Sequence, residues 1–373
     1  WAFFLYLEGI MYFYMPTKVY EEVNCIENHL SDISEFGRVA LVVTGSKSSK
    51  LNGSLSAVEK VLKKLDITYE IFDEIEENPS VETVMKAAKV GINIGAEFVI
   101  GVGGGSPLDA SKAIAILIGE KNTEAAILFD MKKNVNAVDV IAVPTTCGTG
   151  SEVTGVSVLT VHDKRTKMSL PHRIFPKLAL VDYSYLKSAD RRVICNTAID
   201  AMSHLVESYL VKESTSYTDM IVEAGLRTWG RCVDALWGNR DFDDKDYERL
   251  MHAATLGGMS IAHTGTAIPH SLSYSITYEL HVPHGVAVGY FLPGYIYGAG
   301  DEVCGRLLSL MGFTSIEEFA GFYQDVTGIG ILPEKNLEYV VDCVSKNRAK
   351  LSLCRYELDR DKLMNIAMWK YPK

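Results

Sequence analysis

The spacing of hydrophobic residues changes about halfway along the chain. Between residues 38 and 145, short apolar runs rich in β-branched side chains alternate with stretches whose apolar residues recur at helical spacing. The runs predict strands at 39–44, 69–72, 98–102 and 138–143, and the stretches predict helices at 55–65, 81–90 and 108–118. Helices that return the chain to the same sheet build a parallel, helix-covered sheet. The first half is therefore predicted to be α/β.

The second half shows long amphipathic stretches and few strand-like runs. Helices are expected at 198–211, 218–236, 247–263 and 317–327. The two patterns meet near residues 182–190, and a chain of 373 residues is long enough for two separate cores. We therefore predict an α/β domain at 11–187 and an all-helical domain at 188–373, with a cleft between them as the natural place for a ligand.

The apolar start of the chain predicts neither a signal peptide nor a membrane helix. Residues 1–15 contain Glu8, lack a basic leader and are too few to cross a bilayer. Residues 1–10 are interpreted as an extension ahead of a natural start at Met11. The next five residues, 11–15, are expected to form a short edge strand before Pro16.

Charge and cysteine usage exclude several classes of protein. The formal net charge is -10 and the basic residues are dispersed, so neither nucleic acid nor an anionic membrane surface is expected as a partner. The 7 cysteines are odd in number, scattered and free of any Cys-x-x-Cys pair. This argues against a disulfide framework and against a thiolate zinc site, and it favours a reducing cytoplasm.

Two loops that follow predicted strands carry the residues expected to bind an anion. In the first, Gly104 and Gly105 let the backbone approach phosphate oxygens, Ser106 suits the N-cap and Pro107 suits the first helical position. Exposed amides and the helix dipole would then face a diphosphate. The second loop, 144–152, offers several hydroxyls in one short turn. Each alone could be a tight turn without a ligand, and the first lacks the G-x-G-x-x-G spacing of the Rossmann fingerprint.

The helical half contains a candidate metal site. Asp200 and His204 are four residues apart and share one helix face, and His270 and His284 could complete a set of three imidazoles and one carboxylate. Ligands of this kind, without thiolate, suit Fe(II) or Zn(II). Each histidine alone is more often structural, and His281, three residues before His284, is a rival ligand. Spacing leaves this choice open.

These motifs together resemble the iron-containing (group III) alcohol dehydrogenases, in particular the NADP-dependent butanol and 1,3-propanediol dehydrogenase type. The Gly-Gly-Gly-Ser turn, the Pro-Thr-Thr-x-Gly-Thr loop and the Pro-His-Gly occur in the family's order. The resemblance implies the dehydroquinate synthase-like fold, with a dinucleotide-binding α/β domain and a helical metal-binding domain. It assigns the metal ligands to Asp200, His204, His270 and His284. It assigns the diphosphate loop to Gly104, Gly105 and Ser106, and further cofactor contacts to Thr145, Thr146, Thr149, Ser151 and Lys167.

Two departures from the family's pattern bear on the cofactor and the mechanism. NAD-specific relatives tend to carry an aspartate where this chain has Gly45. Its absence, beside Ser46 and Lys47, leaves room, donors and positive charge for a 2′-phosphate, so NADP(H) is predicted to be preferred over NAD(H). Tyr274 stands where many members have a second histidine, which excludes a histidine proton relay there; the tyrosine is either a catalytic polar group or a packing residue.

The resemblance therefore implies an oxidoreductase that transfers a hydride between NADP(H) and a small primary alcohol or aldehyde held on the metal. The alternatives are a polyol or glycerol dehydrogenase, a dehydroquinate synthase-like lyase and a non-catalytic dinucleotide-binding scaffold. The segments 197–212 and 260–295 contain Lys212 as their single Lys or Arg, which favours a small neutral substrate over a phosphorylated acid. A homodimer or higher homo-oligomer is expected by analogy.

Overall fold

The computed structural model describes residues 11–164 and 166–370, so the expected extension 1–10 lies outside the described residues. The chain forms two compact units. One holds the chain up to Thr146 together with Gly150–Ala189, and the other holds Cys147–Thr149 and the chain from Asp190 onward. This grouping places Cys147–Thr149 with the helices, whereas the division at 187/188 stays a prediction about domains.

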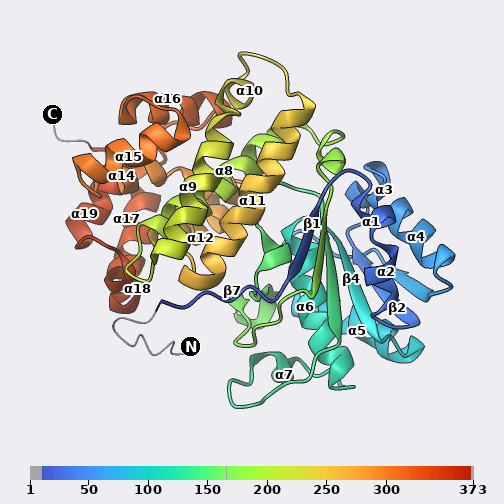
Figure 1. Ribbon diagram of the computed structural model, residues 1–373. Helices are drawn as coiled ribbons and strands as arrows, with labels where there is room; N and C mark the ends of the chain where they lie inside the picture. Colours follow the sequence, from blue (N-terminus) through green and yellow to red (C-terminus); the bar gives the residue numbers. More distant parts are fainter. Residues whose placement is uncertain (1–10, 165, 371–373) are drawn as a thin grey trace. The chain divides into compact units, whose positions relative to one another are not determined.

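The first unit is built on a fully parallel sheet of six strands, in the order β1-β8-β5-β4-β2-β3 (Figure 1). The four predicted strands are confirmed within one residue at each end. The strands are β1 (Lys18–Glu21), β2 (Val39–Thr44), β3 (Thr68–Phe72), β4 (Phe98–Gly103), β5 (Asp139–Pro144) and β8 (Leu178–Val181).

The edge strand expected at 11–15 is wrong. The edge strand is β1, which begins at Lys18 and pairs in parallel with β8. Met11 is 60% exposed, and residues 11–14 are all exposed, so this apolar run has no sheet face to cover. Pro16 instead ends an irregular segment that leads into the strand.

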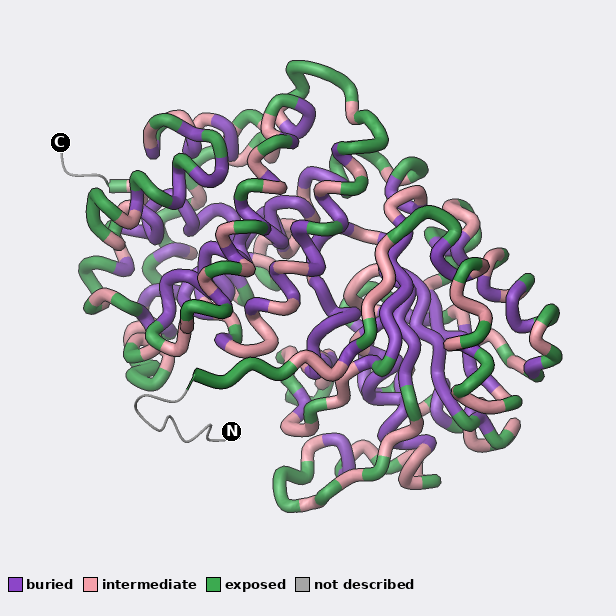
Figure 2. Tube along the Cα trace, in the orientation of Figure 1, coloured by how far each residue is buried: buried purple, intermediate pink, exposed green. Residues whose placement is uncertain are grey.

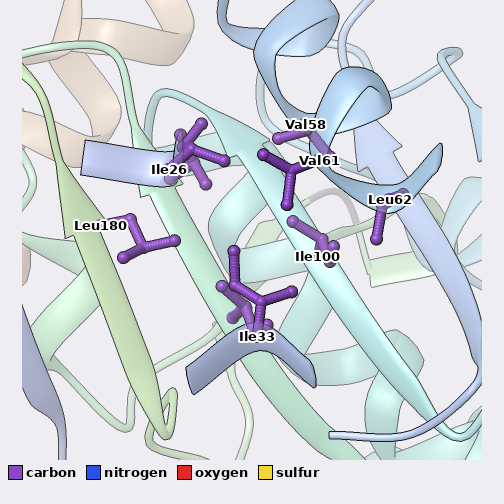
Figure 3. A pocket seen from close by; sticks show the side chains of 9 residues that line it. Ile26, Ile33, Val58, Val61, Leu62, Ile100 and Leu180 are labelled. Atoms are coloured by element: carbon purple, nitrogen blue, oxygen red, sulfur yellow. The ribbon is translucent and has the colours of Figure 1, made fainter. Parts of the chain in front are cut away.

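Helices cover both faces of the sheet, and the strands between them are buried (Figure 2). The helices are α1 (Cys25–Asn28), α2 (Leu30–Ser34), α3 (Ser48–Leu51), α4 (Ser54–Lys64), α5 (Val81–Ile94), α6 (Gly105–Gly119) and α7 (Ala125–Phe129). The face toward α1, α2 and α4 contains a small hollow lined entirely by aliphatic side chains, among them Val58, Ile100 and Leu180 (Figure 3). With no polar group in its lining, this hollow is part of the core and not a site for chemistry.

An antiparallel hairpin, which the sequence reasoning did not predict, follows the second loop. It consists of β6 (Val158–Val161) and β7 (Thr166–Ser169). Three short 3₁₀ turns, Ser151–Val153, His162–Lys164 and Tyr183–Leu186, complete the regular structure of this unit.

The second unit is helical, as predicted. Its helices are α8 (Arg191–Tyr209), α9 (Ser216–Gly230), α10 (Val233–Trp237), α11 (Asp244–Thr264), α12 (Ile268–Leu280), α13 (His284–Gly289), α14 (Leu292–Tyr297), α15 (Asp301–Met311), α16 (Ile316–Thr327), α17 (Glu334–Ser345), α18 (Arg348–Leu353) and α19 (Arg360–Ala367). The single helix expected at 218–236 is wrong, because the chain breaks after Gly230 into α9 and α10.

Helix α8 is the central element of this unit. It packs against α9, α11 and α13, and from Ala198 to Tyr209 every side chain is buried. The Asp190 side chain caps its first turn by accepting from the Arg192 N–H. Over the described part of the chain, no helix has both the length and the apolar character that crossing a membrane requires.

Candidate functional site

Helix α8 carries two neighbouring candidate ligands on its buried length, Asp200 and His204. They lie one turn apart, and both are almost fully buried. The His204 Nε2 lies 3.9 Å from the Asp200 Oδ1. A buried aspartate is costly unless a partner compensates its charge.

Two further imidazoles converge on the same carboxylate oxygen. The Nε2 of His270, on α12, lies 3.7 Å from the Asp200 Oδ1, and the Nε2 of His284, the first residue of α13, lies 3.9 Å from it. Gly285 explains how α13 comes so close. A Cβ there would fall 2.0 Å from the Asn196 carbonyl oxygen and 3.0 Å from the Asp200 Cβ, so only glycine permits this approach to α8.

Some buried polar atoms of the cluster have no hydrogen-bond partner among the described residues. Within residues 11–164 and 166–370, the Asp200 Oδ1 and the His270 Nε2 are buried atoms without a hydrogen-bond partner. The candidate ligand atoms of Asp200, His270 and His284 all lie within 4.8 Å of one another, and the His204 ring stacks on the His270 ring at 4.8 Å between centroids. Imidazole nitrogens with one carboxylate oxygen form a donor set that fits a divalent transition metal.

The rival ligand His281 is not part of this cluster. It is exposed and ends α12 in a left-handed conformation, with a φ of 53°. The described part of the chain holds its one candidate group of metal-ligating atoms at Asp200, His270 and His284. The structure thus distinguishes His284, which lies in the cluster, from His281, which does not, although their spacing in the sequence left both as candidates.

The electrostatics of the cluster favour an ionised carboxylate beside imidazoles. Burial alone would raise the pKa of Asp200, but the neighbouring His204, His284 and His270 outweigh burial and lower it. Burial lowers the pKa of His204, which favours the neutral ring that a metal requires. His270 differs, because Glu207 counteracts the effect of burial and raises its pKa.

Glu207 is a residue that the sequence reasoning missed. It is fully buried on α8, accepts a hydrogen bond from the His270 Nδ1 with one oxygen, and accepts from the Ala267 backbone N–H with the other. The one local signal is its position three residues after His204, which places both on neighbouring turns of the same helix. Spacing could not reveal its partner on α12.

Tyr274 lies beside the cluster. Its ring is parallel to the His284 ring, with an interplanar angle of 4° and centroids 6.3 Å apart, and the side chain is 49% exposed. Its role, catalytic or packing, stays a prediction.

In the first unit, the helix that follows the glycine loop begins earlier than predicted. Helix α6 begins at Gly105 with Gly104 as its N-cap, so the prediction of Ser106 as N-cap and Pro107 as first helical residue is wrong. The Ser106 Oγ instead accepts from the Asn78 N–H at 3.1 Å. A Cβ at Gly103 would lie 2.7 Å from the Pro107 ring, and the φ of Gly103 is +146°, so glycine is required at this position.

The loops expected to bind the dinucleotide follow three neighbouring strands. Gly45, Ser46 and Lys47 follow β2, the glycine loop follows β4, and Thr145 and Thr146 follow β5. Because carboxyl ends of parallel strands share one edge, these loops lie at the same edge of the sheet. The first and second loops are close neighbours, since a Cβ on Gly104 would lie 3.1 Å from the Thr146 Oγ1.

The other predicted cofactor residues differ in their contacts, their exposure and the unit to which they belong. The Lys167 Nζ donates to the Asn78 Oδ1 at 2.6 Å, so Lys167 and Ser106 share Asn78 as a neighbour. Ser46 and Lys47 are exposed. Thr149 groups with the helical unit, whereas Ser151 belongs to the first.

A buried lysine, also missed by the sequence reasoning, ties α6 to the segment after the second loop. The Lys112 Nζ donates to the Ser151 Oγ at 2.6 Å, the Val156 carbonyl at 2.7 Å and the Thr154 Oγ1 at 3.2 Å. Ser151 in turn donates to the Asp109 carboxylate at 2.5 Å. Burial lowers the pKa of Lys112, with Asp109 opposing it.

Comparisons with known proteins agree with this fold. The model of the family "Iron-containing alcohol dehydrogenase" matches residues 16–183, and that of "Fe-containing alcohol dehydrogenase family, C-terminal" matches residues 194–319. An iron-containing alcohol dehydrogenase from Thermotoga maritima, known as a crystal structure, is 35% identical with a TM-score of 0.86, covering 96% of this chain and 100% of that chain.

Two curated relatives are more distant in sequence. NADPH-dependent butanol dehydrogenase of Clostridium saccharobutylicum is 26% identical over 350 residues, which are 92% of this chain and 85% of the relative. Aldehyde-alcohol dehydrogenase 2 of Entamoeba histolytica is 29% identical over 308 residues, 79% of this chain but 35% of the relative. The chain thus spans about a third of the length of this larger protein.

Fold and matches define the class of this protein as a metal-dependent oxidoreductase. The chain belongs to the iron-containing alcohol dehydrogenase family, whose two family models together cover most of its length.

Proposed function

We propose that this protein transfers a hydride between NADP(H) and small primary alcohols or their aldehydes. The observation that carries the proposal is the Asp200 Oδ1, buried without a hydrogen-bond partner among the described residues and surrounded by the Nε2 atoms of three imidazoles. A buried arrangement of this kind is costly to the folded protein unless a cation completes it.

Asp200, His204, His270 and His284 would hold the divalent metal through one carboxylate oxygen and three imidazole nitrogens. When bound, the metal supplies Lewis-acid polarisation of a substrate oxygen, and the nicotinamide supplies or accepts the hydride. The protein's own task is positioning. Helix α8 fixes Asp200 and His204. Glu207 accepts a hydrogen bond from the protonated Nδ1 of His270, which leaves the lone pair on Nε2.

The dinucleotide would bind at the carboxyl edge of the sheet in the first unit. Backbone amides of Gly104, Gly105 and Ser106 at the start of α6 suit a diphosphate. Gly45 places no carboxylate after β2, and the exposed Ser46 and Lys47 supply a donor and a positive charge for a 2′-phosphate. The butanol dehydrogenase relative is itself named NADPH-dependent.

A small, neutral substrate fits the charges of the helical unit. The half-buried Lys350 on α18, whose charge acts on His270, donates to the Thr266 carbonyl and is thus engaged within the protein. A phosphorylated acid, as in dehydroquinate synthesis, would need several cations near the metal. The half-exposed ring of Tyr274 offers an apolar surface instead.

The test is anaerobic oxidation of NADPH, and separately of NADH, by metal-stripped protein given butanal or 3-hydroxypropanal. Turnover is expected after Fe(II) or Zn(II) is added, with NADPH preferred, and is expected to be absent before. As a control, His270→Ala protein should bind NADPH but gain no turnover from metal. Full turnover without metal, or no turnover under any combination despite dinucleotide binding, would contradict the proposal.

A further inference from the structure

One peptide group lies between a half-buried ammonium group and a buried carboxylate behind the candidate metal site. The peptide that joins Thr266 to Ala267 accepts a hydrogen bond on its carbonyl from the Lys350 Nζ, at 2.8 Å. Its N–H, belonging to Ala267, donates to one oxygen of Glu207. The other Glu207 oxygen accepts from the Nδ1 of His270. An ammonium on one side and a carboxylate on the other polarise this peptide in the same direction.

We propose that Glu207, supported by Lys350 through the Thr266–Ala267 peptide, is a positioning residue that holds His270 in the state that binds metal. This inference rests on the metal site of the proposed function. Glu207 has no donor of its own as a carboxylate, so the His270 Nδ1 must carry the proton. The Nε2 lone pair is then directed at the Asp200 side of the cluster, 3.7 Å from Oδ1.

The balance of charge supports the same assignment. Three neutral imidazoles and one carboxylate leave part of a divalent cation's charge uncompensated. Glu207 is fully buried and supplies the missing negative charge through His270, which also makes the imidazole a stronger donor to metal. The positive charge of Lys350 interacts favourably with the carboxylate of Glu207 and also with that of Glu213.

A structural role must be separated from this one, because α8 is tied to the α11–α12 turn twice. Besides Glu207, the neighbouring Ser208 accepts from the Thr264 hydroxyl at 2.9 Å. Ser208 touches the same turn but contacts none of the candidate ligands in these bonds. It is therefore the matched control for a tie that only stabilises the turn.

The decisive variant is Glu207→Gln. A glutamine has one accepting oxygen and a donating amide group, so it can satisfy only one of the two N–H groups that Glu207 accepts. If the oxygen stays with Ala267, the amide faces Nδ1 and favours a proton on the Nε2 of His270, where it blocks metal. Metal affinity should fall even though the side chain keeps its volume.

The experiment titrates metal-free protein with Co(II), without substrate or cofactor, and follows the visible absorption of the bound ion. Glu207→Gln is expected to weaken Co(II) binding about 10- to 100-fold and to change the absorption bands. Lys350→Met should weaken binding in the same direction but less. Ser208→Ala should leave affinity and spectrum unchanged.

Parent-like affinity and spectrum in Glu207→Gln would overturn the proposal, as would equal weakening in Glu207→Gln and Ser208→Ala. Thermal melting of each metal-free variant checks that it folds, and Lys350→Met decides the matter should Glu207→Gln not fold. Co(II) binding that depends on Glu207 in a protein without dehydrogenase activity would refute the proposed function alone. Failure of the unaltered protein to bind Co(II) would refute both.

Discussion

Each unit buries a charged side chain whose compensation can be compared. In the first, Lys112 is fully buried, and its ammonium group donates to three oxygens while Asp109 lies 3.6 Å away. In the second, Asp200 is just as deeply buried, yet its Oδ1 has no donor within the described residues. The first set of charges is complete without a ligand, and the second is not.

This difference separates structural charge from functional charge. A buried charge whose partners all belong to the protein avoids the cost of an unpaired buried group, so such a closed network stabilises the folded chain without a ligand. An open one is tolerated where a ligand completes it. The contrast predicts that variants of Lys112 affect folding, whereas variants of Asp200 affect metal binding.

The largest effect is expected from Asp200→Asn. Loss of the single carboxylate should lower kcat/KM with metal present about a thousandfold, about 4 kcal/mol of transition-state stabilisation. The free energy of unfolding of the metal-free variant should stay within about 1 kcal/mol of the parent value, because no hydrogen bond to Oδ1 is lost. Metal content, turnover and denaturant unfolding measure the two effects. A strongly destabilised metal-free variant would show that Asp200 is structural.

Lys112→Met should act on stability instead. It leaves the half-buried Asp109 carboxylate without its cation and three oxygens around Lys112 without a donor, and the free energy of unfolding should fall by about 3 kcal/mol. The matched control is Lys89→Met, the same substitution at an exposed position on α5, which should be almost neutral. Urea unfolding of the metal-free proteins gives both values. Equal stability of the two variants would mean that the closed network contributes nothing.

Gly45→Asp has the smallest expected effect and concerns the exposed edge of the first unit. A carboxylate there repels a 2′-phosphate and accepts from ribose hydroxyls, so the NADPH to NADH ratio of kcat/KM should fall about tenfold. A new Cβ would lie 3.3 Å from the Ile75 carbonyl oxygen, so crowding must be separated from charge. Gly45→Ala is the control. A similar loss in both variants would attribute the shift to crowding.

The sheet could be predicted closely because its central strands are buried on both faces. Such strands are continuous apolar runs, and those of β2, β4 and β5 stand out against the amphipathic helices between them. The short strand β8 went unpredicted, and the edge strand was placed on exposed residues instead of at β1. Both β1 and β8 are only four residues long, and so short a run carries little signal even where it is buried, as in β8.

The candidate metal ligands were found partly from spacing and partly from resemblance, and the residues around them were not found. Asp200 and His204 share a helix face, so their proximity is local information. The contacts of Glu207 with α12 and of Lys112 with the segment after the second loop exist only in the folded chain. The helix start predicted from the serine cap was wrong, because the Ser106 side chain accepts from Asn78, which is distant in sequence, instead of capping the helix.

Gly285 has a consequence for the substitutions that this protein can accept. Helix glycines are ordinarily replaceable, and Gly321 on α16 has nothing within 4 Å of the space that a side chain would fill, so alanine there should raise stability by about 0.5–1 kcal/mol. At position 285 even a methyl group would overlap the backbone of α8. In a library that replaces every position in turn, residue 285 should therefore be invariant although it carries no chemistry.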